Sequence, residues 1–222
     1  ELISINRNPT NLGIEKHFNL AVKKTKGDII GFLGADNRYP SNYVEGCLKV
    51  LLGNEDKAIA YTDLVLFGNR AEIMYGLFHK DFKGLKLEGG IFTIDFPRFS
   101  ERSKQVLLAG LNFMHGSSMY KRKAFEQAGG YKSRSGGHED HTLFQSITRS
   151  GWGAEKVENV YLEYRQHSVE QANQQFSFFS ELSFLRKQFQ GVKKNKTKLE
   201  ELQQAYDLIT IERDRAQGEL QD

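Results

Sequence analysis

The sequence predicts an α/β fold, in which a mixed, mainly parallel sheet is flanked by helices and followed by a long C-terminal helix. Apolar, strand-like runs alternate with segments of helical periodicity from residue 1 to residue 68. The run DIIGFLG at 28–34 is apolar on both faces, which is typical of a buried parallel strand. Beyond about residue 180 glycine nearly disappears, and Gln, Glu, Lys and Leu dominate. We therefore expect an α/β domain over 1–180 and a helical tail over 181–222.

The first elements alternate between strand and helix. The opening segment ELISI, 1–5, is expected to be a strand. A helix should follow over 11–27, because apolar residues recur there at helical spacing and a glycine ends the segment. After the strand at 28–34, we expect a second helix over 41–54 and a third strand over 57–68. This order is typical of a sheet that is covered by helices.

The middle of the chain has no clear period. The segment AEIMYGLF, 71–78, could pair as a hairpin with the strand before it, and 89–99 is rich in aromatic residues but irregular. We interpret 67–112 as a loop-rich region, the kind of region that carries specificity in many enzymes.

Regular structure is expected again from residue 114. A short strand and a helix ended by two glycines fit 114–131, a further helix fits 138–151, and one or two strands fit 152–167. Ser117 and Ser118 fall at the end of the short strand. Such small residues either line an acceptor cleft or serve packing.

The tail carries a heptad-like seam with charged residues on its other faces. This pattern predicts self-association through a coiled coil, although a single amphipathic helix docked on its own domain would show the same spacing. The seam consists of Leu199, Leu202, Tyr206, Ile209, Arg213, Ala216 and Leu220.

Composition excludes several classes of protein. The net charge of +3 is too small to indicate nucleic-acid binding. A single cysteine, Cys47, excludes an internal disulfide framework and a cysteine zinc cluster. No run approaches the ~20 apolar residues that an integral membrane segment needs, and the opening residues lack the pattern of a signal peptide, so we expect neither. We expect a cytoplasmic protein, either free or peripheral to the inner face of a membrane.

An acidic loop follows the apolar strand at 28–34. Asp36 stands in the loop Gly34-Ala35-Asp36-Asn37, and ligands of α/β sheets bind beyond the carboxyl ends of the strands. A carboxylate there can hold a divalent cation such as Mg²⁺ or Mn²⁺, and the cation can hold a diphosphate. Alternatively, Asp36 caps the following helix or sets the turn before Pro40.

Two further segments carry candidate site residues. Glu139 and Asp140 open the helix at 138–151, where a carboxylate either stabilises the helix N-terminus or takes a proton from an attacking hydroxyl. Arg165 and His167 follow the last strand. Arginine binds phosphate through two parallel hydrogen bonds, and histidine can ligate a metal.

In their order, these segments resemble the inverting glycosyltransferases of family 2, which have the GT-A fold. The resemblance covers residue 1 to about 170. It rests on five motifs: Asn11-Leu12-Gly13, GDIIGFLGADN at 27–37, GGY at 129–131, HED at 138–140 and YRQH at 164–167.

The resemblance implies a mechanism and a set of site residues. Asp140 would be the catalytic base with Glu139 supporting it, and Asp36 and His167 would hold the metal. The nucleotide-sugar donor would be bound by Asn11, Gly13, Asp36 and Arg165. A glycan, a lipid-linked molecule or a protein would be the acceptor, and the sugar would be transferred with inversion.

The chain departs from the family pattern in two places. Gly34 and Asn37 stand where the family often has further acidic residues, which predicts either a weaker metal site or fewer contacts to the ribose. The strand-helix-strand unit that normally cradles the nucleotide base is expected to be missing before residue 1. Two other classes therefore stay open: a catalytically degenerate GT-A module that binds or assembles on a coiled coil, and a nucleotidyltransferase.

Overall fold

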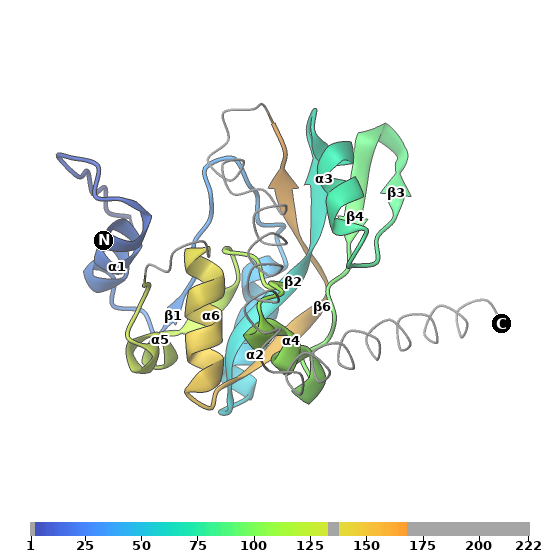
Figure 1. The fold of residues 1–222 in the computed structure, drawn as a ribbon. Helices are drawn as coiled ribbons and strands as arrows, with labels where there is room; N and C mark the ends of the chain where they lie inside the picture. Colours follow the sequence, from blue (N-terminus) through green and yellow to red (C-terminus); the bar gives the residue numbers. More distant parts are fainter. Residues whose placement is uncertain (1–2, 133–137, 168–222) are drawn as a thin grey trace, which may run out of the picture.

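The structure, a computed structural model, describes residues 3–132 and 138–167. Within these ranges it is a mixed α/β fold with a sheet flanked by helices (Figure 1), as the sequence predicts. The described part of the sheet has six strands. They are β1 (Ile29–Ile30), β2 (Lys57–Phe67), β3 (Lys86–Leu87), β4 (Ile91–Ile94), β5 (Met119–Lys121) and β6 (Gly153–Arg165).

Strand β2 organises the sheet. One of its edges pairs in parallel with β6 from Lys57 to Phe67, with two register shifts. Its other edge is shared by two short antiparallel strands, β5 at Ile59 and Ala60 and β4 at Leu64 to Leu66. Strand β1 then pairs with β5, and β3 pairs with β4, both antiparallel.

The described sheet is therefore mainly antiparallel, and the prediction of a mainly parallel sheet is wrong. The prediction rests on the apolar character of both faces of the run at 28–34. That character reports that both faces of a strand are covered, which helices can do for either strand direction. Here β2 is buried from Ala58 to Leu64, but most of its neighbours run against it.

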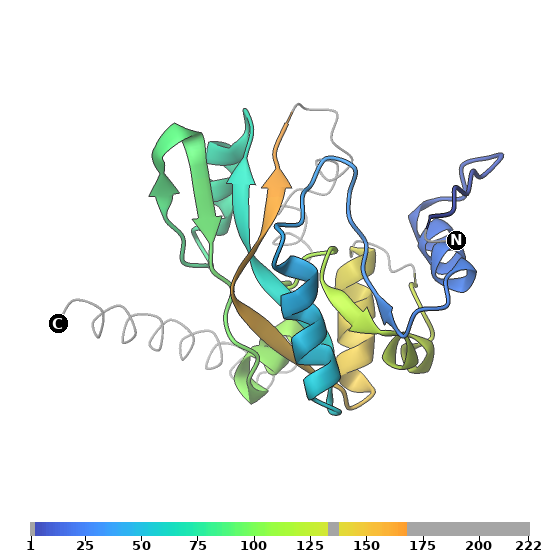
Figure 2. The same ribbon diagram turned by 180° about the vertical axis from the view of Figure 1, so that it is seen from behind.

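Helices cover both faces of the sheet. Figure 2 shows α2 (Tyr43–Gly53) in front of β2 and β6, and Figure 1 shows α6 (Glu139–Arg149) on the opposite side. Helix α2 buries Tyr43, Cys47 and Leu51, which share one face because they are spaced by four. The other helices are α1 (Ile14–Lys24), α3 (Ala71–Phe78), α4 (Glu101–Ala109) and α5 (Arg122–Ala128), and a 3₁₀ turn covers Glu88–Gly90.

Several predicted elements are confirmed. Helices occur within 11–27, 41–54, 114–131 and 138–151, and strand β2 occupies 57–68 as predicted. The strand predicted at 152–167 is the single long strand β6, which carries an irregular segment between Lys156 and Tyr161. Asn159 lies in that segment with φ of 58°, a conformation that asparagine tolerates better than most residues.

Other predictions are wrong in detail. Residues 3–5 form no strand, and the strand at 28–34 shrinks to Ile29–Ile30, because its partner β5 is only three residues long. The segment 71–78 forms helix α3 and no hairpin. Gly68, with φ of 101°, ends β2, and Tyr75 of α3 stacks on Phe92 of β4 at 4.9 Å between ring centroids.

The region 67–112 is more regular than predicted. It holds α3, β3, β4 and α4, and α4 begins with a capping box in which Ser100 and Ser103 bond each other's backbone amides. The tail, with its heptad-like seam, lies outside the described residues. Across the described ranges, no helix combines the length and the apolar character that a membrane crossing requires.

Candidate functional site

The predicted site residues gather around one end of the sheet. Strands β2 and β6 both point their carboxyl ends there, and the loop between β1 and α2 and the N-terminus of α6 lie toward the same end (Figure 1). The loop is tied to β6 by two backbone hydrogen bonds between Arg38 and Glu163, at 3.0 and 3.1 Å. The loop thereby extends the free edge of β6.

Asp36 and His167 meet at this end. The Nε2–H of His167 donates a hydrogen bond to Oδ2 of Asp36 at 3.0 Å, although the two residues are 131 positions apart. The neighbouring residues add a second link, because the backbone N–H of Arg165 donates to Oδ1 of Asn37 at 3.1 Å. Asn37 therefore fixes the end of β6 to the acidic loop, a role that its motif position did not suggest.

The Asp36–His167 pair fits a cation that arrives together with phosphate. The described residues contain no cluster of three or more His, Cys, Asp or Glu side chains that could form a complete metal site. The two side chains are 32% and 38% exposed, so their ligand atoms are accessible. Mg²⁺ is commonly held by one or two carboxylates plus substrate phosphates and water, Mn²⁺ also prefers oxygen ligands, and histidine is a common metal ligand in general. Asp36 Oδ2 and His167 Nε2 would be the protein's ligands, with the imidazole proton moved from Nε2 to Nδ1 when a cation replaces the hydrogen bond between them.

Asp140 lies against the turn formed by residues 115–118. Its Oδ1 accepts a hydrogen bond from the backbone N–H of His141 at 2.6 Å, so it satisfies one of the free amides at the start of α6. Its Oδ2 faces Gly116, where an added Cβ would come within 3.1 Å of that oxygen. Glu139 occupies the same first turn of α6 and is half-buried.

A half-buried histidine anchors the same turn to β2. Thr62 donates its hydroxyl proton to the carbonyl of Asp63 at 3.0 Å, so its oxygen accepts from Nε2 of His115 at 3.1 Å. Burial lowers the pKa of His115 to about 3, and the imidazole is therefore neutral at physiological pH. Ser117 and Ser118 are also buried, at 7% and 0% exposure.

The remaining predicted binding residues lie at the start of α1. The backbone N–H of Gly13 donates to Oδ1 of Asn11 at 2.8 Å, and Gly13 has φ of 76°, which favours glycine. No hydrogen bond within the described ranges joins this pair to Asp36 or His167. Arg165 is exposed at the end of β6.

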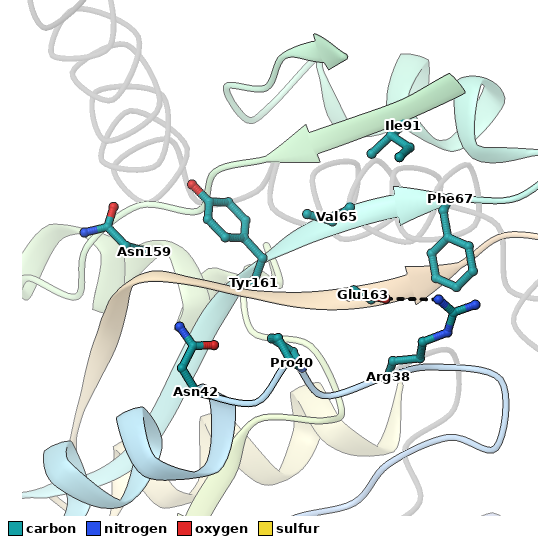
Figure 3. Close-up of a pocket in the computed structure, with 9 residues that line it drawn as sticks. All are labelled: Arg38, Pro40, Asn42, Val65, Phe67, Ile91, Asn159, Tyr161 and Glu163. Atoms are coloured by element: carbon teal, nitrogen blue, oxygen red, sulfur yellow. Dashed lines mark hydrogen bonds and ion pairs between the residues drawn. The ribbon is translucent and has the colours of Figure 1, made fainter. Parts of the chain in front are cut away.

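A separate pocket of about 450 Å³ opens on the face of the sheet that α2 partly covers (Figure 3). The Arg38 guanidinium lies over the Phe67 ring at 4.7 Å and bonds Glu163 at 3.4 Å on one side of this pocket. None of the predicted catalytic or metal-binding residues lines it. The lining consists of Arg38, Pro40, Asn42, Val65, Phe67, Ile91, Asn159, Tyr161 and Glu163.

The fold and the site belong to an α/β protein whose sheet is flanked by helices and whose acidic loop lies at the carboxyl ends of the parallel strands β2 and β6. The family model described as "Glycosyl transferase family 2" matches residues 1–129 of the chain. The chain belongs to this family. The match includes Asp36 and the 115–118 turn, whereas Asp140 and His167 lie beyond it. No curated protein matches the chain.

Proposed function

We propose that this chain transfers a sugar from a nucleotide-sugar donor to an acceptor hydroxyl, with inversion at the anomeric carbon and with Mg²⁺ or Mn²⁺ as cofactor. Membership of family 2 supports glycosyl transfer in general. The observation that carries the finer proposal is the contact between Asp36 and His167 at the carboxyl end of the sheet. That contact brings together two side chains that can ligate a metal, at the end of the sheet where α/β folds bind their ligands.

The donor side of the site would be formed by the acidic loop and the end of β6. When bound between Asp36 and His167, the cation would neutralise charge on the leaving diphosphate. The exposed guanidinium of Arg165 can bind phosphate oxygens in the same region. Asn11 and Gly13 remain proposed donor-binding residues near α1. The acceptor would be a glycan, a lipid-linked molecule or a protein.

The acceptor side would be formed by Asp140 and the 115–118 turn. The Asp140 carboxylate would take the proton from the attacking hydroxyl as its oxygen bonds to the anomeric carbon. The bond between that carbon and the diphosphate oxygen would break on the opposite face, so the configuration inverts. The N-terminus of α6 is an electrostatically favourable place for a carboxylate, and Glu139 adds a second acidic group there.

The proposal is tested by turnover of the full-length protein. A panel of nucleotide sugars is incubated with sugar, lipid-linked and peptide acceptors in Mg²⁺, in Mn²⁺ and in chelator, and release of nucleoside diphosphate is measured. We expect metal-dependent release with one donor, and NMR of the product should show the inverted anomer. Absence of diphosphate release across the panel, with or without donor binding, would overturn the proposal in favour of a non-catalytic module.

The Asp36→Ala substitution should weaken manganese-dependent nucleotide binding. We expect the affinity for nucleoside diphosphate in Mn²⁺ to fall at least about tenfold, because even outer-shell partners of metal sites contribute about 10- to 100-fold. Calorimetry with and without Mn²⁺ measures this loss. Asp28→Ala is the matched control, because Asp28 is an exposed carboxylate just before β1, whereas Asp36 follows β1. Equal affinities of Asp36→Ala and the parent in Mn²⁺ would remove Asp36 from the site.

The Gly116→Ala substitution should slow turnover through Asp140. The added Cβ would lie 3.1 Å from Asp140 Oδ2, so the carboxylate must move by a few tenths of an ångström. We expect kcat to fall roughly 3- to 10-fold, since a displacement of about 1 Å can cost about 100-fold. Gly76→Ala is the control, because a Cβ at Gly76 meets nothing within 4 Å. Equal kcat values for the two variants would contradict the prediction.

A further inference from the structure

Two stacked tyrosines lie beneath the candidate site. The rings of Tyr39 and Tyr43 are 4.0 Å apart and inclined by only 9°. Both hydroxyls reach the carbonyl oxygen of Ser117 at 3.0 Å. The Tyr39 hydroxyl is also 2.8 Å from the carbonyl oxygen of Phe32, so its single proton is shared between two carbonyls. The Tyr43 hydroxyl reaches Ser117 and also the side chain of Thr62, but not Phe32.

The two carbonyls that Tyr39 bridges belong to different halves of the site. Phe32 lies in the loop after β1 that also carries Asp36, and Asp36 bonds His167. Ser117 follows Gly116, the residue that Oδ2 of Asp140 faces. Tyr39 is therefore a direct connection between the proposed metal-binding loop and the turn beneath the proposed base.

The hydrogen bonds from Tyr39 to Phe32 and Ser117 form a rigid bridge between the two segments. Burial raises the pKa of Tyr39 and of Tyr43, so both hydroxyls stay protonated and donate hydrogen bonds. Tyr43 is fully buried at 0% exposure, and its ring holds that of Tyr39 in place by stacking. Beyond the bridge, the loop is held at Arg38 by its two backbone bonds to Glu163.

We propose that Tyr39 is a positioning residue that sets the spacing between the Asp36–His167 pair and the Asp140 carboxylate. The inference rests on the proposed function, because it assigns those groups to the donor and the acceptor side of one reaction. A donor held by the Asp36 loop must present its anomeric carbon to a hydroxyl held near Asp140. Loosening Tyr39 therefore misplaces two bound groups relative to each other and leaves each binding contact intact.

The structure offers a matched pair of variants as the test. Tyr39→Phe and Tyr43→Phe each remove one hydroxyl from Ser117, and both keep the ring stack. Tyr39→Phe alone also releases Phe32. We expect Tyr39→Phe to lower kcat about tenfold or more, with the donor KM within about twofold of the parent, because misplacement by an ångström is costly. Tyr43→Phe should keep kcat within about twofold.

Hydrogen–deuterium exchange supplies a readout that does not depend on turnover. The amides of Asn37 and Arg38 are hydrogen-bonded, to Gly34 and Glu163. Peptides over 31–38 should exchange faster in Tyr39→Phe and at the parental rate in Tyr43→Phe. Tyr61→Phe, whose hydroxyl donates to Pro97, is the control if Tyr43→Phe does not fold.

The outcomes separate the inference from the proposed function. Parental kcat in Tyr39→Phe, equal losses of kcat in both tyrosine variants, or unchanged exchange over 31–38 would overturn the inference. If the parent protein turns over no donor, the proposed function fails. The hydrogen–deuterium exchange data alone then decide whether Tyr39 links the Asp36 loop to the 115–118 turn. Faster exchange confined to Tyr39→Phe then supports the link, and equal exchange rejects it.

Discussion

Substituting Asp140 by asparagine should lower turnover at least about 100-fold, the lower end of what general-base catalysis contributes. The asparagine keeps the shape of the side chain and removes its basicity, so a hydroxyl bound beside Gly116 would lose its proton acceptor. Donor binding should change little, because the proposed donor ligands lie on the Asp36 loop, at the end of β6 and at the start of α1, and Asp140 is not among them. Steady-state kcat and calorimetry of the donor, measured on the same preparation, check both parts.

The asparagine variant also separates catalysis from helix stabilisation. Asparagine can still accept the hydrogen bond that Asp140 Oδ1 now accepts from His141, so only the attraction between the carboxylate charge and the helix N-terminus is lost, about 0.3–1 kcal/mol. The melting temperature should therefore stay near that of the parent. A Glu139→Gln variant, one residue away, should lose less activity. A nearly unchanged rate in Asp140→Asn would exclude this residue as the base and would favour a non-catalytic binding module.

The Lys156→Met substitution should produce the largest loss of stability. Lys156 Nζ bonds Asp63 Oδ2 at 2.8 Å, and the two side chains are only 10% and 4% exposed. The backbone N–H of Phe96 donates to the other oxygen of Asp63 at 2.7 Å. Removing the lysine leaves a buried carboxylate without a counter-ion, which costs about 3–5 kcal/mol of unfolding free energy. Denaturant unfolding at pH 7 to 8 measures this change.

The loss should depend on pH in a defined direction. Burial raises the pKa of Asp63 above its unfolded value, although Lys156 and the Phe96 amide lower it. A carboxyl whose pKa is higher in the folded than in the unfolded state stabilises the fold at pH values below its unfolded pKa. This contribution to stability disappears as the pH rises through the folded-state pKa. Without Lys156 the pKa of Asp63 rises further. The loss of unfolding free energy in Lys156→Met, relative to the parent, should therefore grow with pH and shrink on acidification.

An exposed lysine supplies the control for this pair. Lys86 bonds Glu72 at 2.6 Å, but the two side chains are 62% and 72% exposed. Lys86→Met should therefore change the unfolding free energy by less than about 1 kcal/mol. Similar effects of the two lysine substitutions would show that the buried pair is not a special determinant of stability.

The parts of the fold that were predicted correctly are those determined by local pattern. Helices α2 and α6 bury residues at helical spacing, and β2 is a long apolar run between charged and glycine-containing turns. Strand direction was not predictable in this way, because the pattern of a doubly covered strand is the same for parallel and antiparallel pairing. Helix α3 was missed because its continuous apolar run lacks a distinctive period.

The site was predicted unevenly for a related reason. The order of the motifs was enough to propose Asp36 and His167 as neighbours, and the structure brings them into contact. Their roles as metal ligands, and that of Asp140 as base, stay predictions. The contributions of Tyr39, Gly116 and His115 could not be predicted, because each depends on a contact between elements far apart in the chain.

The sharing of β2 between three partners also has a consequence for biosynthesis. Both antiparallel partners of β2 leave the ribosome before its parallel partner, β6, which starts at Gly153. At about 5–20 residues per second, roughly 100 further residues take about 5 to 20 seconds to synthesise. Throughout that time the edge of β2 that later pairs with β6 is free, and its other edge is also free until β4 and β5 have been synthesised. A free strand edge is a template for misassociation. Shielding of the nascent chain by chaperones would be most valuable during this interval of translation.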